Sequence, residues 1–325
     1  MLSRVADSIY WLGRYIERAE NYARFIDVNF NLMLDLPSNY KTQWDPLISA
    51  TGDRNLYLAK YDQFDRQNVI YFLVFDIENP NSMYTSIAKA RENARTVREK
   101  LTKETWEKLN EIYLLFKKLM EAKVWEQEDP RDFVSDIKYR IQLLYGISDS
   151  TVARTEGWFF LRLGQFLERA DKTSRILDVK YHILLPSPKE VGNAVDILHW
   201  MALLKSVSGF NIYRQIYGNI EPTNIVDFLV LNSSFPRSII YCLEQAEKCL
   251  GEISGSNGTG FKNLAEKNLG LLYSQLEYYD VEDVITIGLH EFLDNLQLKI
   301  NNISNAIHSA YFSAEHPYSF QNQTQ

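Results

Sequence analysis

Apolar positions recur with helical spacing along most of the chain, most densely in the stretch from residue 10 to residue 34. At about 100° per residue, the polar residues Arg14, Glu17, Asn21 and Arg24 fall on one narrow stripe, within roughly 60° of Glu17. The remaining faces of this helix are apolar, which is typical of a buried helix. Because an unpaired buried charge costs several kcal/mol, the charges of the stripe must be paired.

The same pattern occurs a second time. Residues 161–185 align with residues 10–34 without a gap at a constant offset of 151. The identical pairs include Gly13/Gly164, Glu17/Glu168, Arg18/Arg169, Arg24/Arg175 and Asp27/Asp178. Weaker matches between the two halves follow in order at offsets of 152 to 159. We therefore expect Glu17, Arg24, Glu168 and Arg175 to be buried and bonded to one another across a pseudo-two-fold axis.

The remaining segments also have helical periodicity, and prolines and glycines fall mostly between them. We predict helices over residues 44–50, 54–77, 82–101, 104–123, 131–146 and 149–185. The fold class is all-α, a single domain built by tandem duplication of a four- to six-helix unit. The first repeat covers about residues 1–155 and the second about residues 156–315, with 316–325 predicted to be a disordered polar tail.

Two Gly-x-x-x-Glu-Arg-Ala motifs, starting at Gly13 and Gly164, carry a family resemblance. The second precedes a Lys-Tyr-His-Ile-Leu-Leu-Pro segment, and residues 90–98 and 227–243 extend the similarity over essentially the whole chain. The chain resembles the bacterial Alpha-E family, an all-helical domain named for its Glu-Arg motif. The resemblance implies partnership with circularly permuted ATP-grasp proteins and transglutaminase-like cysteine peptidases, but it implies no activity of its own.

Charge and cysteine content limit the partners and the cellular location that we expect. The formal net charge is −7 and the pI is near 5.4, which argues against a nucleic-acid partner or an anionic membrane surface. No apolar run approaches the roughly 20 residues that span a bilayer. Cys242 and Cys249, seven residues apart on one predicted helix, lie about 10 Å apart and cannot form a disulfide. These features predict a cytoplasmic protein.

Recognisable catalytic motifs are missing from the sequence. It has no His-Glu-x-x-His, no Glu-x-x-His pair and no local signature of a nucleophile. We therefore predict neither a metal nor a cofactor.

The polar stripes remain as candidates, together with a row of arginines at Arg91, Arg95 and Arg98 that lines one helical face. At an offset of 152 these arginines align with Leu243, Glu247 and Leu250, so this row is basic in one half of the sequence only. Such a group beside Glu17 would suit carboxylate or phosphate recognition. The alternative is a solvated basic face partnered by Glu92 and Glu99. The candidate anion-binding and motif residues are Arg14, Glu17, Arg18, Asn21, Arg24, Arg91, Glu92, Arg95, Glu168, Arg169 and Arg175.

Two functions fit these observations. The first is a non-catalytic accessory or scaffold protein that works with an ATP-grasp-type ligase in peptide or amide-bond synthesis. The second is an enzyme in which Glu17 or Glu168 acts as acid or base and Arg14, Arg91 and Arg95 hold an anionic substrate. Nearby arginines lower the pKa of a carboxylate, which opposes acid–base catalysis and favours the first function. The sequence leaves homodimer formation open.

Overall fold

The structure is a computed structural model that describes residues 1–35, 44–127, 129–182, 193–256 and 260–313, and within these ranges it is helical without strands. The all-α prediction is therefore confirmed. The helices are α1 (Ser3–Asp35), α2 (Asp45–Thr51), α3 (Arg54–Leu58), α4 (Arg66–Val74), α5 (Met83–Thr96), α6 (Lys103–Glu121), α7 (Val124–Gln127), α8 (Pro130–Thr151), α9 (Glu156–His182), α10 (Ala194–Ser206), α11 (Phe210–Tyr217), α12 (Pro222–Val230), α13 (Ile239–Ser254), α14 (Leu264–Glu277), α15 (Val281–Ile287) and α16 (Leu289–Ile307).

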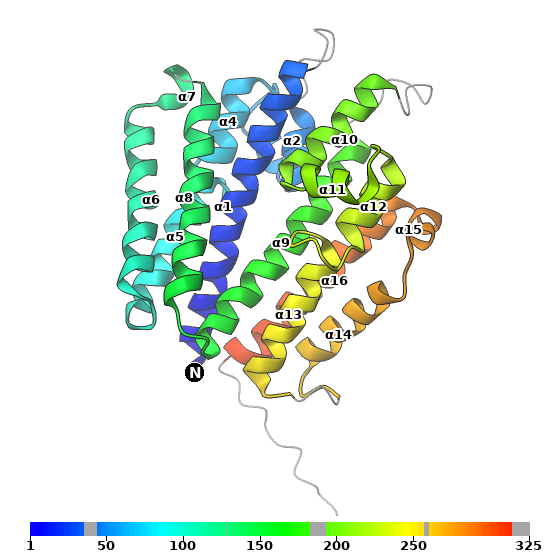
Figure 1. Ribbon diagram of the computed structural model, residues 1–325. Helices are drawn as coiled ribbons and strands as arrows, with labels where there is room; N and C mark the ends of the chain where they lie inside the picture. The colour runs from blue at the N-terminus through cyan, green and yellow to red at the C-terminus, as the bar shows by residue number, and fades with distance from the viewer. Residues whose placement is uncertain (36–43, 128, 183–192, 257–259, 314–325) are drawn as a thin grey trace, which may run out of the picture.

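Two groups of four long helices form the body of the molecule, joined through α1 and α9 (Figure 1). In the first group α1 packs against α5 and α8, and α6 closes the group by packing against both of these. In the second group α9 packs against α13 and α16, and α14 closes it in the same way. The short helices are exchanged, since α2 packs against α9 and α10 packs against α1. The two motif helices are thus the centre of the fold, and a hydrophobic core continues through both groups.

Side-chain caps explain where several helices begin. The hydroxyl of Ser82 accepts a hydrogen bond from the Thr85 amide and so caps α5, close to the predicted helix start at residue 82. The predicted single helix over residues 54–77 is wrong, because it is two helices separated by a turn. Asp65 caps the second of them by accepting from the Asn68 amide.

Three other predicted boundaries also differ from the structure. The helix predicted to reach residue 101 ends at Thr96 and is followed by a short 3-10 turn over Arg98–Lys100. Helix α8 continues through Thr151, so that α9 begins at Glu156.

The predicted tail, residues 316–325, lies outside the described residues. None of the described helices has an apolar stretch long enough to cross a membrane.

The crossing of α1 and α9 depends on a glycine in each helix. A Cβ atom at Gly13 would lie 2.2 Å from the carbonyl oxygen of Leu161, and one at Gly164 would lie 2.2 Å from that of Tyr10. At the 151-residue offset Tyr10 corresponds to Leu161, so the two close contacts are reciprocal. Both neighbours are backbone atoms of a rigid helix, and they cannot move aside for a methyl group.

Replacement of Gly13 or Gly164 by Ala should therefore separate the two motif helices. We expect each change to lower the free energy of unfolding by about 1–3 kcal/mol or more, measured by urea denaturation. Gly146→Ala in α8 is the matched control, because a Cβ there meets no atom within 4 Å. The control should be stabilised by about 0.5–1 kcal/mol, since Ala favours a helix interior over Gly. Equal, small effects at all three glycines would contradict the close crossing.

Candidate functional site

The Glu-Arg pairs of the two motif helices bind each other. Arg169 of α9 donates from Nε and Nη2 to the two carboxylate oxygens of Glu17 in α1, both at 2.8 Å. In return, Arg18 of α1 donates from Nε to Glu168 Oε1 at 2.7 Å and from Nη2 to Oε2 at 3.2 Å. Both carboxylates are fully buried. Each motif thus supplies the carboxylate for one bidentate pair and the guanidinium for the other.

The first ion-pair cluster surrounds the carboxylates of α1. Arg237, which precedes α13, contacts Glu17 Oε1 from Nη1 at 3.3 Å and donates from Nη2 to Glu20 Oε2. Tyr145 of α8 donates its hydroxyl to Glu17 Oε2 at 2.8 Å. The charged members of this cluster are Glu17, Glu20, Arg24, Arg169 and Arg237.

The second ion-pair cluster surrounds the carboxylates of α9. Arg14 donates to Glu168 Oε2 at 2.7 Å and to the Ser304 hydroxyl of α16, also at 2.7 Å. Lys172 Nζ lies 3.5 Å from Glu168 Oε1 and 2.9 Å from Asp171 Oδ2. The charged members are Arg14, Arg18, Glu168, Asp171, Lys172 and Arg175.

Arg24 and Arg175 hold different partners from those we expected. We predicted that these arginines would bond to Glu17 and Glu168 across the pseudo-two-fold axis. Instead Arg24 donates to Glu20 at 2.7 Å and Arg175 to Asp171 at 3.0 Å. Side chains four residues apart are neighbours on a helical face, so Glu20 and Asp171 lie close enough to pair with these arginines. Three of the four residues are buried as predicted, whereas the Arg175 side chain is 22% exposed.

The ends of the exchanged short helices contact these same two arginines. Arg24 of α1 donates to the Ser208 hydroxyl and, at 3.5 Å, to the Ser206 carbonyl at the end of α10. Arg175 of α9 lies against Gly52 at the end of α2, where a Cβ would come within 2.9 Å of its Nη1. Ser208 and Gly52 both have positive φ, at 55° and 79°. The two clusters thus extend from the central crossing to the termini of α2 and α10.

Asn21 also belongs to the first cluster, whereas the arginine row of α5 lies apart from both. Asn21 donates to Glu17 Oε1 at 3.1 Å. Arg91 donates to Asn110 Oδ1 of α6 at 2.7 Å and also pairs with Glu92. Arg95 pairs with the same Glu92 at 2.8 Å, with its own side chain 65% exposed. The predicted grouping of Arg91 and Arg95 beside Glu17 is therefore not formed, and both arginines pair with Glu92 instead.

The capping serines indicate a different alignment of the two halves in this region. Ser82 and Ser238 each cap a helix by accepting from the amide three residues further on. They are 156 residues apart, whereas we matched this region at 152, about one helical turn out of step. At an offset of 156, Arg91, Arg95 and Arg98 align with Glu247, Gly251 and Ser254, so they remain basic in one half only.

Lys172 and Arg237 belong to the clusters but were not among our candidate residues. The 151-residue offset pairs Lys172 with Asn21, and the serine caps pair Arg237 with Asn81. The first cluster therefore contains one further cation, Arg237 from the segment before α13. The second contains Lys172 from α9. These two Asn-to-cation differences are the signal in the sequence that could have identified both residues.

The electrostatics of the clusters favour ionised carboxylates. Burial acts to raise the pKa of Glu17, but Arg169 and Arg237 outweigh it and hold this pKa below its ordinary value. Burial likewise opposes ionisation of Glu168, yet Arg18, Lys172 and Arg14 hold its pKa well below the usual range. The pKa of Tyr145 is raised well above 10, by burial first and then by Glu17. Neither motif carboxylate is thus suited to take up a proton near neutral pH.

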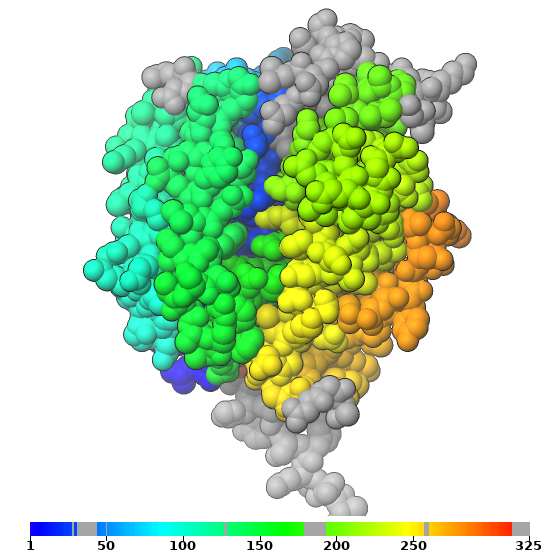
Figure 2. Space-filling model, in the orientation of Figure 1, coloured from blue at the N-terminus to red at the C-terminus, as the bar shows by residue number. Residues whose placement is uncertain are grey.

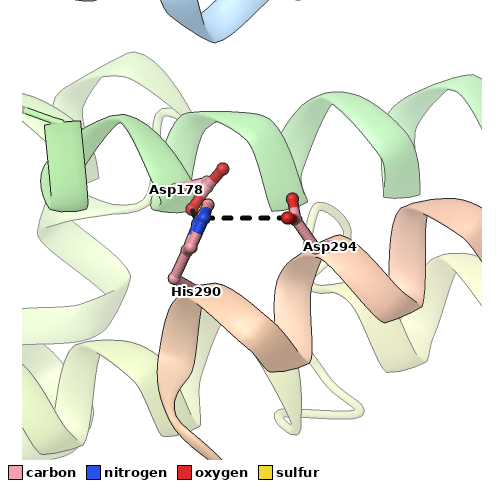
Figure 3. Close-up of side chains that lie close together, drawn as sticks. All are labelled: Asp178, His290 and Asp294. Carbon is pink, nitrogen blue, oxygen red and sulfur yellow. Dashed lines mark hydrogen bonds and ion pairs between the residues drawn. The ribbon is translucent and has the colours of Figure 1, made fainter.

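A separate group of side chains in the described part of the chain could hold a metal ion. Asp178 of α9 lies beside His290 and Asp294 of α16 (Figure 3). We predicted no metal site from the sequence, because Asp178 is 112 residues from His290 and the three residues form no recognised motif.

Comparison with known proteins now identifies the family. A family model described as a predicted alpha-helical domain with a conserved ER motif matches residues 1–312. The chain belongs to the Alpha-E family. The Glu-Arg pairs of this Alpha-E chain are the residues that α1 and α9 exchange at the centre of the fold.

Curated relatives of this Alpha-E chain include uncharacterized proteins of Mycobacterium bovis and Mycobacterium tuberculosis. Each is 24% identical over 321 residues, and each match covers 90% of this chain but 34% of the relative. The chain thus spans about a third of the length of the curated relatives it matches. No solved structure matches it.

Removal of one motif carboxylate should destabilise the fold. We expect Glu17→Ala to lower the free energy of unfolding by about 3–5 kcal/mol in urea denaturation, because Arg169 then remains buried without its partner. Glu92→Ala is the matched control, since it breaks pairs with Arg91 and Arg95 at the surface and should cost at most about 1 kcal/mol. An unchanged stability for Glu17→Ala, with a loss of function, would instead make Glu17 a functional residue.

Proposed function

We propose that this Alpha-E chain is a non-catalytic helical accessory or scaffold protein for an ATP-grasp-type ligase that makes a peptide or amide bond. The observation that carries the proposal is the saturation of Glu17 and Glu168, which are fully buried and bonded to arginines from the facing helix. These ion pairs hold α1 and α9 in one arrangement, and a rigid arrangement of helices suits a protein that presents a docking surface. The ligase as partner rests on the family resemblance.

The alternative is an enzyme that handles a small anionic substrate, and it has less support. A general acid or base needs a pKa near the working pH and must reach the substrate. Glu17 and Glu168 have lowered pKa values and no exposed surface. Arg95, which we had expected to help hold the substrate, pairs with Glu92 instead.

We also propose that the two four-helix groups arose by tandem duplication and are related by a pseudo-two-fold axis. Three reciprocal features support this. They are the glycine contacts of α1 and α9, the exchanged Glu-Arg pairs, and the contacts of Arg24 and Arg175 with the ends of α10 and α2. As part of the proposal we place the protein in the cytoplasm, where the buried and unpaired Cys242 and Cys249 would remain reduced.

The face formed by α14, α15 and α16 is the docking surface that we assign to the ligase. Figure 1 shows α14 and α15 along one edge of the second group, beyond α13, with α16 behind α13. In the space-filling view the orange atoms of α14 and α15 form this edge (Figure 2). The chain exposes large apolar side chains there, including Leu271 and Leu298, both 62% exposed. A hollow between α14 and α16 adds polar groups that could hydrogen-bond to a partner, among them Asn268, Gln275 and Asn302. This apolar surface with polar groups beside it is typical of a protein interface.

The length of the relatives supports contact with a second folded unit. In the mycobacterial proteins the matched region shares one chain with a remainder about twice as long, because the match covers 34% of each. We propose that the α14–α16 face of this chain binds an ATP-grasp-type protein. A transglutaminase-like cysteine peptidase is the second partner that the family resemblance offers.

The double variant Leu271→Glu/Leu298→Glu tests this docking face. We expect the wild-type chain to co-purify with an ATP-grasp-type protein from the same genome and to raise its ligase activity. The variant should weaken that complex by about tenfold or more, because it places charges in an apolar contact. Its melting temperature should change little, since both side chains are exposed.

Leu114→Glu/Leu143→Glu is the matched control, with exposed leucines on α6 and α8 of the first group. This control should bind as the wild type does. The docking proposal fails if no complex forms and the ligase turns over equally well alone, and the assigned face is wrong if the control variant is the one that loses binding. Light scattering on the isolated chain distinguishes a homodimer formed through the same face.

A further inference from the structure

Three possible metal ligands meet where α9 packs against α16. Asp178 lies near the end of α9, and His290 and Asp294 lie one turn apart on one face of α16 (Figure 3). His290 Nδ1 is 2.7 Å from Asp178 Oδ1, and its Nε2 is 3.6 Å from Asp294 Oδ2. One ligand atom from each residue lies within 4.8 Å of the other two. The three groups therefore converge on a volume small enough for a single ion.

The ligand types and their access suit a divalent transition metal. Imidazole nitrogen with carboxylate oxygen binds ions such as Zn²⁺ and Mn²⁺, and two carboxylates offset the charge of a divalent cation. The side chain of Asp294 is 57% exposed and that of Asp178 is 12% exposed. An ion with its remaining water ligands can thus enter from the Asp294 side, while Asp178 forms the inner wall.

The corresponding contact in the first group shows what such a position requires. Asp27 of α1 matches Asp178 at the 151-residue offset and accepts from Lys138 Nζ of α8 at 2.6 Å. In the first group the Lys138 ammonium of α8 therefore binds the Asp27 carboxylate of α1. In the second group α16 supplies the His290 imidazole and the Asp294 carboxylate beside Asp178 of α9. A bound cation could join these two side chains to Asp178.

We propose that Asp178, His290 and Asp294 form a binding site for one divalent first-row transition-metal ion, which joins α9 to α16. Asp178 and Asp294 lie beside different ring nitrogens of His290, and one imidazole nitrogen holds an ion, so binding requires a side-chain rotation that brings both carboxylates to the same nitrogen. In a tetrahedral site with metal–ligand distances near 2.0–2.1 Å, ligand atoms lie about 3.3 Å apart. The His290–Asp178 pair must open from hydrogen-bonding distance, and Asp294 must approach the ring. The site lies outside both ion-pair clusters and does not depend on the proposed docking function.

Calorimetric titration of the chelator-treated full chain with Zn²⁺, Mn²⁺ and Mg²⁺ tests the site. We expect one Zn²⁺ per chain, weaker binding of Mn²⁺ and little binding of Mg²⁺, in keeping with the affinity order of such ligands. His290→Gln and Asp294→Asn should each weaken Zn²⁺ binding by about tenfold or more. Zn²⁺ should raise the melting temperature of the wild type but not of these variants.

Two controls keep the test specific. Asp27→Asn changes the matching aspartate of α1 and should leave Zn²⁺ binding intact. His308→Gln removes an exposed histidine outside the group and should also bind as the wild type does. The proposal is overturned if the wild type takes up no Zn²⁺, or if His290→Gln and Asp294→Asn bind it as tightly as the wild type. Since Asp294 is largely exposed, its replacement leaves the fold intact and keeps this result decisive.

Discussion

The structure depends on the exchange of buried carboxylate–guanidinium pairs between α1 and α9. Glu17 is held by Arg169, and Glu168 is held by Arg18, so neither helix can bury its own carboxylate without the other. Removing charges from water costs several kcal/mol per ion, and close, bidentate partners are needed to offset that cost. The close crossing at Gly13 and Gly164 brings the two helices near enough for these bonds. Geometry and charge are therefore parts of one constraint.

This constraint also fixes the register of the two groups. A slip of one helical turn would leave buried charges without partners, whereas a purely apolar contact would tolerate it at much lower cost. The additional cations extend the effect outward. Arg237 ties the segment before α13 to α1, and Arg24 ties the end of α10 to the same helix. A chain built in this way has a well-defined surface, which is what a docking role requires.

Much of the fold could be predicted from the sequence because its signals are local. Helical periodicity identified the all-α class, and the repeated apolar helix with its polar stripe predicted buried, paired charges. The partners of those charges could not be predicted. Periodicity places Glu17 and Arg24 on one face of α1. The partner of Glu17, however, is Arg169 of α9, and this contact depends on how the two helices pack. Arg237 precedes a helix and belongs to no stripe, so only its matched position in the other half marks it.

The same limit explains the misplaced arginine row and the missed metal ligands. Arg91 and Arg95 have the spacing of a helical face, but spacing alone does not say which face meets α1. Asp178 and His290 are distant in sequence and come together only when α9 packs against α16. Sites formed within one helix are thus visible in the sequence, whereas those formed between helices need the packing.

A double-mutant cycle tests the exchange of partners most directly. It compares the unfolding free energies of Glu17→Gln, Arg169→Ala and the double variant, and then repeats the comparison with Arg18→Ala in place of Arg169→Ala. The account predicts a coupling energy of about 1–3 kcal/mol between Glu17 and Arg169, and one below about 0.5 kcal/mol between Glu17 and its sequence neighbour Arg18. Strong coupling of Glu17 to Arg18, with none to Arg169, would contradict it.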